Sequence, residues 1–291
     1  MKQSESVFIT IRGQRYHCRC WGPLGQPRLF LLHGWMDVSA SFQFLVDAFR
    51  REWRVIAPDW RGFGLTAWNA ADSYWFPDYF ADLDGILNHF QPESPVTLVG
   101  HSMGGNIASM FAGMRPSRVA RVVNLEGFGL APGRPEDAPH RYAKWMGQIA
   151  RGARFRDYSS FEELADRLRA SNSRLTPERA HFLSRHWGRA SPGGRVELVS
   201  DPAHKLINPI PYRIDETLAC WRHVTAPVLW VTGADTDMIR RIKLTDADLA
   251  LRKSCFGDVR ESVIPGAGHM LHHDQPERLA EAIEDFLARA G

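Results

Sequence analysis

The chain has 291 residues, of which 44% are hydrophobic and 24% charged, and its formal net charge is only +3. A chain of this length and composition can bury a sizeable core, as one large domain or two smaller ones. Its basic residues are scattered, with no basic run interleaved with aromatic residues, so the composition argues against a nucleic-acid partner.

The N-terminus has no apolar stretch of the kind that a signal peptide requires, and no span approaches about 18 uninterrupted apolar residues. We therefore expect no signal peptide, no membrane helix and no membrane partner. The four cysteines form no CxxC pair and no ligand cluster with histidine. This pattern predicts reduced thiols, no metal site and a cytoplasmic protein.

The first third of the chain predicts alternating strands and helices. A hairpin is predicted where β-forming residues 7–11 and 15–21 flank Arg12-Gly13-Gln14. Beyond it we expect strand 29–32, helix 39–50, strand 54–58, helix 79–90, strand 96–99, helix 106–112 and strand 119–125. Near-continuous apolar strands that alternate with helices are typical of a mostly parallel sheet covered on both faces.

The alternation stops at Gly127, and residues 131–221 lack it. This segment begins with a Pro- and Gly-rich stretch and then predicts only short helices, at 141–149, 161–170 and 177–187. We interpret it as a helical cap inserted over the carboxyl edge of the sheet, where open α/β sheets bind their ligands.

The alternation resumes after the cap and completes the core, which we place at residues 1–130 and 222–291. Strands are predicted at 226–233 and 259–264. A final helix is predicted over 275–290, with Asp274 as its cap and Glu277 three residues on.

The core is organised around Gly100-His101-Ser102-Met103-Gly104, a Gly-x-Ser-x-Gly motif between a strand and a helix. A strand that becomes a helix within about two residues must turn sharply, and glycines on both sides avoid collisions of a Cβ with neighbouring backbone. Such a nucleophile elbow exposes Ser102 above the first turn of the helix, where free N–H groups favour negative charge.

A serine nucleophile needs a base that a third group orients. We predict His269 as the base, because it lies in a Gly-rich loop between the last strand and the final helix. His272 and His273 are nearby alternatives, which we expect to face solvent.

Three carboxylates compete for the role of the orienting acid. Asp237 is preferred, because it follows the strand before the last and precedes an apolar pair that would turn it inward. Glu126 is the main competitor, since it follows the strand after the elbow helix, and Asp235 is a third choice.

The oxyanion formed by attack on a carbonyl needs two preorganised N–H donors. We predict the backbone N–H groups of Met103 and Trp35, the latter because Gly34 lets the loop bend toward Ser102. For the substrate site we expect contacts from His33, Gly34, His101, Phe128 and Trp145. The aromatic residues of these loops and of the cap suggest a partly apolar substrate.

Two further features receive structural interpretations. Asp59-Trp60-Arg61-Gly62-Phe63-Gly64 lacks the spacing of a dinucleotide or phosphate loop, and we predict a tight structural loop in which Trp60 or Phe63 can touch the pocket. We expect His204 on the surface of the cap.

In combination and in order, these motifs resemble the α/β-hydrolase superfamily. The resemblance covers about 200 residues and includes His33-Gly34-Trp35, the Asp59–Gly64 loop, the Ser102 elbow, a later acid and Gly266-Ala267-Gly268-His269. It implies an eight-stranded sheet with an inverted second strand and a lid between the sixth and seventh strands. Haloalkane dehalogenases and epoxide hydrolases of this fold have aspartate at the elbow, so Ser102 argues against both.

We therefore predict a serine hydrolase that cleaves a carboxylic ester, thioester or lactone through an acyl-enzyme, without a cofactor. The expected partner is a small, partly apolar acyl substrate, and the protein is expected to be a monomer or homodimer. Two alternatives remain: a cofactor-independent ring-cleaving dioxygenase or C–C hydrolase, and a non-catalytic receptor on the same fold.

Overall fold

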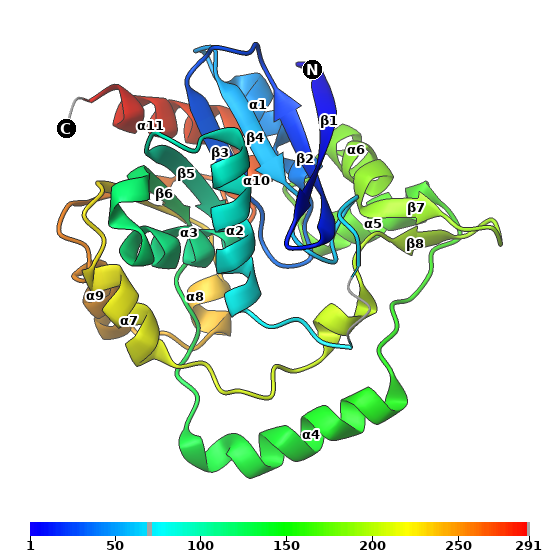
Figure 1. Ribbon diagram of the computed structural model, residues 1–291. Helices are drawn as coiled ribbons and strands as arrows, with labels where there is room; N and C mark the ends of the chain where they lie inside the picture. Colours follow the sequence, from blue (N-terminus) through cyan, green and yellow to red (C-terminus); the bar gives the residue numbers. More distant parts are fainter. Residues whose placement is uncertain (69–71, 290–291) are drawn as a thin grey trace.

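The computed structural model describes residues 1–68 and 72–289, and it has one large sheet (Figure 1). Eight strands form this sheet in the order β1 (Ser4–Ile11), β2 (Gln14–Trp21), β4 (Arg54–Pro58), β3 (Arg28–Leu32), β5 (Val96–His101), β6 (Val119–Leu125), β9 (Val228–Gly233) and β10 (Val259–Ile264). Strand β2 is antiparallel to its neighbours β1 and β4. All the other pairs of neighbouring strands in this sheet are parallel. The predicted sheet with an inverted second strand is confirmed.

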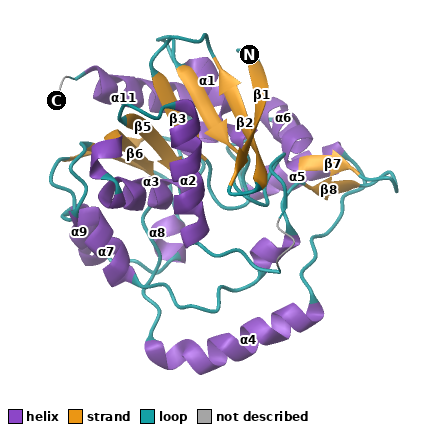
Figure 2. Ribbon diagram, in the orientation of Figure 1, coloured by secondary structure: helices purple, strands orange, loops and turns teal. Residues whose placement is uncertain are grey.

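Helices cover both faces of the sheet (Figure 2). Strand β3 shows why: Phe30 and Leu32 contribute to one buried cluster and Leu29 and Leu31 to another, because successive side chains point to opposite faces. The first cluster is covered by α2 (Pro77–Phe90), α3 (Met103–Met114) and α7 (Ile214–Arg222). The second is covered by α1 (Gln43–Ala48), which follows the turn η1 (Ser39–Phe42), and by α11 (Pro276–Ala288).

The segment between β6 and β9 is inserted at the carboxyl edge of the sheet. It contains α4 (Ala138–Arg151), α5 (Phe161–Ser171) and α6 (Pro177–Trp187), close to the predicted ranges. It also contains a two-stranded sheet, β7 (Gly188–Ala190) and β8 (Val196–Leu198), which the sequence analysis did not predict. Figure 1 shows α4 standing apart from the other helices, with a long connection at each end.

Helix α7 lies at the end of the segment that the sequence analysis assigned to the cap, yet it packs on the core. Its Trp221 is 1% exposed or less and belongs to the same buried cluster as Phe111 of α3. Full burial of such a side chain stabilises the fold by about 2–3 kcal/mol. Helix α7 therefore packs as part of the core layer beside α3.

The remaining elements are short. They are α8 (Met238–Arg241), α9 (Asp246–Lys253), α10 (Leu271–Asp274) and the turns η2 (Pro116–Arg118), η3 (Pro135–Asp137) and η4 (Pro202–Lys205). The single final helix predicted over 275–290 is preceded by α10, and residue 290 lies outside the described residues. Among the described residues, no helix combines the length and apolar character needed to cross a bilayer.

Candidate active site

Ser102 lies at the sharp turn between β5 and α3, with φ 51° and ψ −113°. This backbone conformation is rare for a residue with a side chain, and it destabilises the folded state by about 1–3 kcal/mol. The turn is kept by Ser102 N–H donating to the Leu125 carbonyl at 2.8 Å and by Asn106 N–H donating to the Ser102 carbonyl at 3.0 Å. Hydrogen bonds to β6 and within α3 therefore keep Ser102 in its strained conformation.

The glycines of the motif are required by close backbone approaches. A Cβ on Gly104 would lie 2.1 Å from the Leu32 carbonyl oxygen, and one on Gly100 would lie 2.3 Å from the Gly104 carbonyl oxygen. Non-bonded atoms do not approach this closely, so α3 can lie against the sheet at this point only because both residues lack a side chain.

The imidazole of His269 faces the carboxylate of Glu126, with Nδ1 and Oε2 2.8 Å apart. The carboxylate accepts, so Nδ1 bears the proton and Nε2 keeps its lone pair. The Glu126 side chain is fully buried, whereas 19% of the His269 side chain is exposed. Among the described residues, no hydrogen bond joins Ser102 Oγ to this imidazole; catalytic hydrogen bonds are often long without substrate.

The Glu126 carboxylate has two further donors, one from the last residue of β9 and one from the loop that follows it. Gly233 N–H donates to Oε1 at 2.8 Å, and Thr236 Oγ1 donates to Oε2 at 2.7 Å. The residue itself has a left-handed φ of 56°. Asn124 stabilises this turn, because its Oδ1 accepts from Gly127 N–H at 2.7 Å and its Nδ2 donates to the Gly127 carbonyl at 3.1 Å.

The other two acid candidates have different partners. Asp237 is 40% exposed and pairs with Arg241 at 2.8 Å, and Asp235 pairs with Arg174 at 3.0 Å. Among the described residues, neither contacts His269 by a hydrogen bond. The preferred candidate of the sequence analysis therefore lies at the surface, and the competitor Glu126 lies against the imidazole.

The loop that bears His269 is fixed from two sides. His101 Nε2 donates to the His269 carbonyl at 2.8 Å, and Gly268 N–H donates to Asp274 Oδ2 at 2.8 Å. The second bond corrects a prediction: Asp274 does not cap the final helix, whose N-cap residue is Gln275 with no side-chain hydrogen bond. Asp274 stabilises the histidine loop instead.

The loop after β3 lies directly over the elbow. A Cβ on Gly34 would lie 3.2 Å from Ser102 Cβ, so the loop needs glycine there. Trp35 follows, 55% exposed, and among the described residues its backbone N–H has no protein acceptor. Met103 is the first residue of α3, where a backbone N–H has no intrahelical partner. In the part of the chain that the structure describes, neither N–H group has a protein acceptor.

Three of the residues expected to contact substrate are almost completely buried: His33 (0% exposed), His101 (2%) and Phe128 (1%). His33 Nδ1 donates to the Gly34 carbonyl at 2.7 Å, and its Nε2 accepts from Trp60 N–H at 2.9 Å. These bonds occupy the imidazole and shape the loop, so direct contact with substrate does not fit this position. Trp145, on α4, is half-buried.

Two further expectations about histidines are wrong. His272 and His273 were expected to face solvent, yet they are 0% and 3% exposed, because their rings pack beside Phe42 and Phe44. His204 was expected on the cap surface, yet it is 9% exposed and stacks between Phe63 and Tyr74 at 3.9 and 3.7 Å. Burial lowers its pKa to about 3, so it packs as a neutral ring.

The Asp59–Gly64 loop is a tight structural loop, as predicted, but it does not offer Trp60 or Phe63 to a pocket. Both side chains are 0% exposed. The Asp59 carboxylate accepts from Ser39 N–H at 2.6 Å and from Leu65 N–H at 2.9 Å, and it pairs with His17 at 2.7 Å. This buried carboxylate joins β2, η1 and its own loop.

Comparisons with known proteins agree with this architecture. A family model described as the alpha/beta hydrolase fold matches residues 27–276. The serine hydrolase-like protein of Danio rerio is 30% identical over 285 residues, which cover 95% of this chain and 85% of that protein. The 3-hydroxybutyrate-oligomer hydrolase of Cupriavidus necator is 29% identical over 285 residues, 91% of this chain and 90% of that protein.

A solved structure is also similar over the whole chain. A hypothetical protein from Pseudomonas aeruginosa PAO1 has a TM-score of 0.86 and 25% sequence identity, covering 98% of this chain and 100% of that one. The fold, the strained serine and these relatives define an enzyme of the hydrolase class. The chain belongs to the alpha/beta hydrolase fold family.

Proposed function

We propose that the enzyme hydrolyses a carboxylic ester, thioester or lactone through an acyl-enzyme on Ser102, with His269 as the base and Glu126 as the acid. The observation that carries this proposal is the 2.8 Å contact of His269 Nδ1 with the buried Glu126 carboxylate beside a strained serine turn. The contact fixes the tautomer in which Nε2 can accept a proton.

In the proposed reaction, His269 Nε2 takes the hydroxyl proton as Ser102 Oγ attacks the carbonyl carbon. The imidazolium is stabilised by Glu126, and the oxyanion by the N–H groups of Met103 and Trp35, each donor contributing about 3 kcal/mol. His269 then returns the proton to the leaving alcohol or thiol. Water, deprotonated by the same imidazole, releases the acid and regenerates Ser102.

We further propose that the inserted segment acts as a cap over this site. Two contacts with the loops around His269 support it. Asn172, directly after α5, donates to Asp274 Oδ1 at 2.7 Å, and Arg174 pairs with Asp235 at 3.0 Å. A cap of this kind would select among acyl groups by shape and would limit access of water.

The name of one relative narrows the choice of test substrates. The Cupriavidus necator protein is named a 3-hydroxybutyrate-oligomer hydrolase, and oligomers of a hydroxy acid are joined by ester bonds. We therefore include such oligomers, beside p-nitrophenyl esters of rising chain length, in the substrate panel for this enzyme.

The test combines covalent labelling with turnover. A serine-directed fluorophosphonate is expected to modify wild type at Ser102 and to leave Ser102→Ala unlabelled. Ser102→Ala is also expected to reduce kcat/KM on the best ester by at least about 1,000-fold. Turnover of an aromatic substrate with dioxygen that survives Ser102→Ala would instead favour the cofactor-independent dioxygenase, in which the His269–Glu126 pair deprotonates the substrate.

A further inference from the structure

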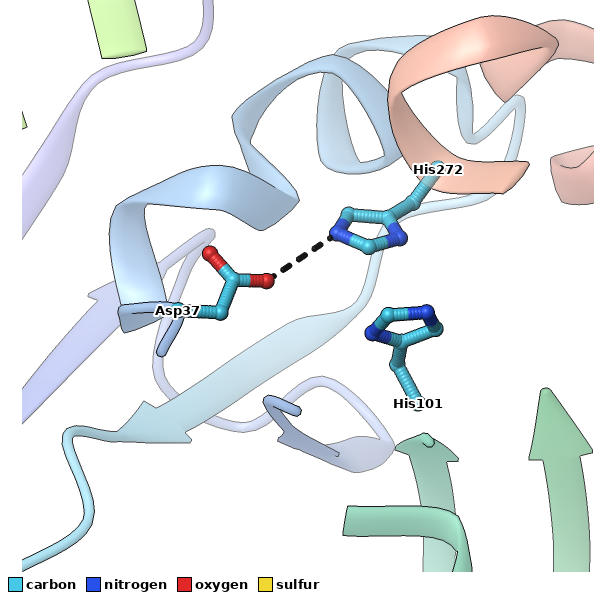
Figure 3. Close-up of side chains that lie close together, drawn as sticks. All are labelled: Asp37, His101 and His272. Carbon is cyan, nitrogen blue, oxygen red and sulfur yellow. Dashed lines mark ion pairs between the residues drawn. The ribbon is translucent and has the colours of Figure 1, made fainter. Parts of the chain in front are cut away.

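Behind the elbow, three buried side chains from distant parts of the chain face one another (Figure 3). Asp37 follows β3, His101 ends β5 and His272 lies in α10, and each is at most 2% exposed. One potential ligand atom from each lies within 4.8 Å of the other two. None of the three side chains takes part in the chemical steps of the proposed acyl transfer.

The cluster contains a concentration of unpaired polar atoms. Among the described residues, Asp37 Oδ2, His101 Nδ1 and both ring nitrogens of His272 are buried without a hydrogen-bond partner. Asp37 Oδ2 and His272 Nε2 lie 3.4 Å apart, an ion-pair distance without hydrogen-bond geometry. A buried polar group left unpaired costs about 1–3 kcal/mol, so four in one place indicate a missing partner.

A hydrogen bond leaves one of these atoms as an electron-pair donor. His101 donates its Nε2 proton to the His269 carbonyl at 2.8 Å, so its Nδ1 has a lone pair.

We propose that Asp37, His101 and His272 form a binding site for one divalent transition-metal ion of the Zn²⁺ class. Two imidazoles and one carboxylate suit Zn²⁺, whereas Mg²⁺ and Ca²⁺ prefer oxygen ligands alone. Ligand bonds of about 2.0–2.1 Å in a tetrahedron put neighbouring ligand atoms about 3.3–3.4 Å apart. The Asp37–His272 distance of 3.4 Å already matches this edge.

His101 completes the triangle if the Asp37 and His272 side chains move toward its ring, which the hydrogen bond to the His269 carbonyl restrains. The three ligand atoms lie within 4.8 Å of one another, so closing to a tetrahedral edge requires up to about 1.5 Å of adjustment. Gly34 packs close to His101 Nδ1, because a Cβ at Gly34 would lie only 2.9 Å from this nitrogen. A water molecule would occupy the fourth ligand position.

A metal ion here would tie together the three elements that surround the elbow. It would join the loop after β3, the end of β5 and α10, and it would hold His101, which bonds to the His269 carbonyl. Because such an ion binds the folded chain and not the unfolded one, it is expected to raise the thermal unfolding temperature.

The test measures metal binding directly and does not depend on any substrate. Chelator-treated protein is dialysed against Zn²⁺, and its metal content is determined by elemental analysis; Co²⁺ binding is followed by the visible absorption of tetrahedral cobalt. Wild type is expected to bind one ion per chain and to unfold at a higher temperature with zinc. His272→Gln is expected to bind zinc at least about 100-fold more weakly.

Two control variants locate the ion. His273→Gln removes an adjacent imidazole that is also buried, 3% exposed, but lies outside the cluster, and it is expected to keep one ion. His269→Gln is likewise expected to keep it, which separates this site from the catalytic histidine. Circular dichroism establishes that each variant is folded, and Asp37→Asn replaces His272→Gln if the latter is not.

Three results would overturn the proposal. They are a wild type that binds no ion after refolding with zinc, a His272→Gln variant that binds like wild type, and loss of the ion on His269→Gln with retention in His272→Gln. In the first case the unpaired atoms are bridged by water, and in the others the ion sits elsewhere.

Discussion

Nδ1 of His269 lies 2.8 Å from the carboxylate of Glu126, although 143 positions separate the two residues in the chain. The contact distinguishes Glu126 from Asp237, which is exposed and pairs with Arg241. If Glu126 orients the base, an amide at this position would favour the wrong tautomer of His269.

Glu126→Gln is therefore expected to lower kcat on the best ester by about 100- to 10,000-fold, with a smaller effect on KM. Asp237→Asn is the matched control and is expected to change kcat by less than about threefold, since surface ion pairs contribute little. Steady-state kinetics across pH measures both variants. A reversal, with the larger loss in Asp237→Asn, would transfer the acid role to Asp237.

The sequence predicted Ser102 and His269 as candidates because their signals are local. The Gly-x-Ser-x-Gly turn between strand and helix and the Gly-rich loop after the last strand are both visible within about ten residues. The choice of acid is not local. Glu126 and Asp237 both follow strands that end at the same sheet edge, and the difference rests on distant partners of the Glu126 carboxylate, Gly233 and Thr236.

The buried histidines were missed for a related reason. The pattern after Gly268 predicts a loop followed by one helix, and in that arrangement His272 and His273 would be exposed. The structure inserts the short helix α10 instead, which places the His272 ring against Asp37 of the loop after β3 and the His273 ring beside Phe44 of α1. Nothing in the spacing of Asp37, His101 and His272 indicates that they meet, because each comes from a different element.

The glycine over the elbow gives a prediction about catalysis rather than stability. A Cβ at Gly34 would lie 2.9 Å from His101 Nδ1 and 3.2 Å from Ser102 Cβ. The His101 ring cannot yield freely, since its Nε2 holds the His269 carbonyl. Gly34→Ala is expected to displace the loop that bears the Trp35 N–H and to reduce kcat/KM at least about tenfold.

The control for Gly34→Ala is Gly257→Ala, because a Cβ at Gly257 meets nothing within 4 Å. Its kcat/KM is expected to stay within about twofold of wild type, as for most surface substitutions. Kinetics and chemical unfolding are measured on both variants. Wild-type kinetics in Gly34→Ala would contradict the assigned position of the oxyanion loop.

The buried Asp59 carboxylate predicts part of the acid sensitivity of the fold. Burial alone would raise the pKa of Asp59. The hydrogen bond and charge of His17 lower this pKa by more than burial raises it, so the net value is about 2 against an ordinary value of 3.8. The folded state thus binds the proton more weakly than the unfolded state. The stabilisation, about 2 kcal/mol, is complete above pH 5 and is lost as the pH falls through 3.8 toward 2.

Urea unfolding of wild type and Asp59→Asn at several pH values measures this contribution. The difference in unfolding free energy between them is expected to narrow by about 1 kcal/mol from pH 6 to pH 3. Asp157→Asn changes an exposed carboxylate and should show no such narrowing. A constant difference for Asp59→Asn would mean that the carboxylate is not preferentially ionised in the folded state.

Substitution of alanine for glycine is expected to change the unfolding free energy in opposite directions at two helical positions, Gly113 and Gly147. A Cβ on Gly113 in α3 would lie 1.8 Å from the Cys220 carbonyl oxygen in α7, so alanine must push these helices apart. A Cβ on Gly147 in α4 would meet nothing closer than 3.5 Å, and that nearest atom ends the Arg151 side chain. Overpacking costs about 1–3 kcal/mol, whereas glycine to alanine in an open helix position gains up to about 1 kcal/mol.

Gly113→Ala is therefore expected to lower the unfolding free energy by about 1–3 kcal/mol, and Gly147→Ala to raise it by up to about 1 kcal/mol if α4 unfolds together with the core. Chemical unfolding of both variants checks the pair, since helix propensity favours alanine equally in each. Stabilisation of Gly113→Ala would show that α7 does not pack this closely on α3 and that the core layer described above is looser. If Gly147→Ala has the same unfolding free energy as wild type, α4 unfolds independently of the core. Such behaviour is expected of a helix that stands apart from the sheet and has no buried residue.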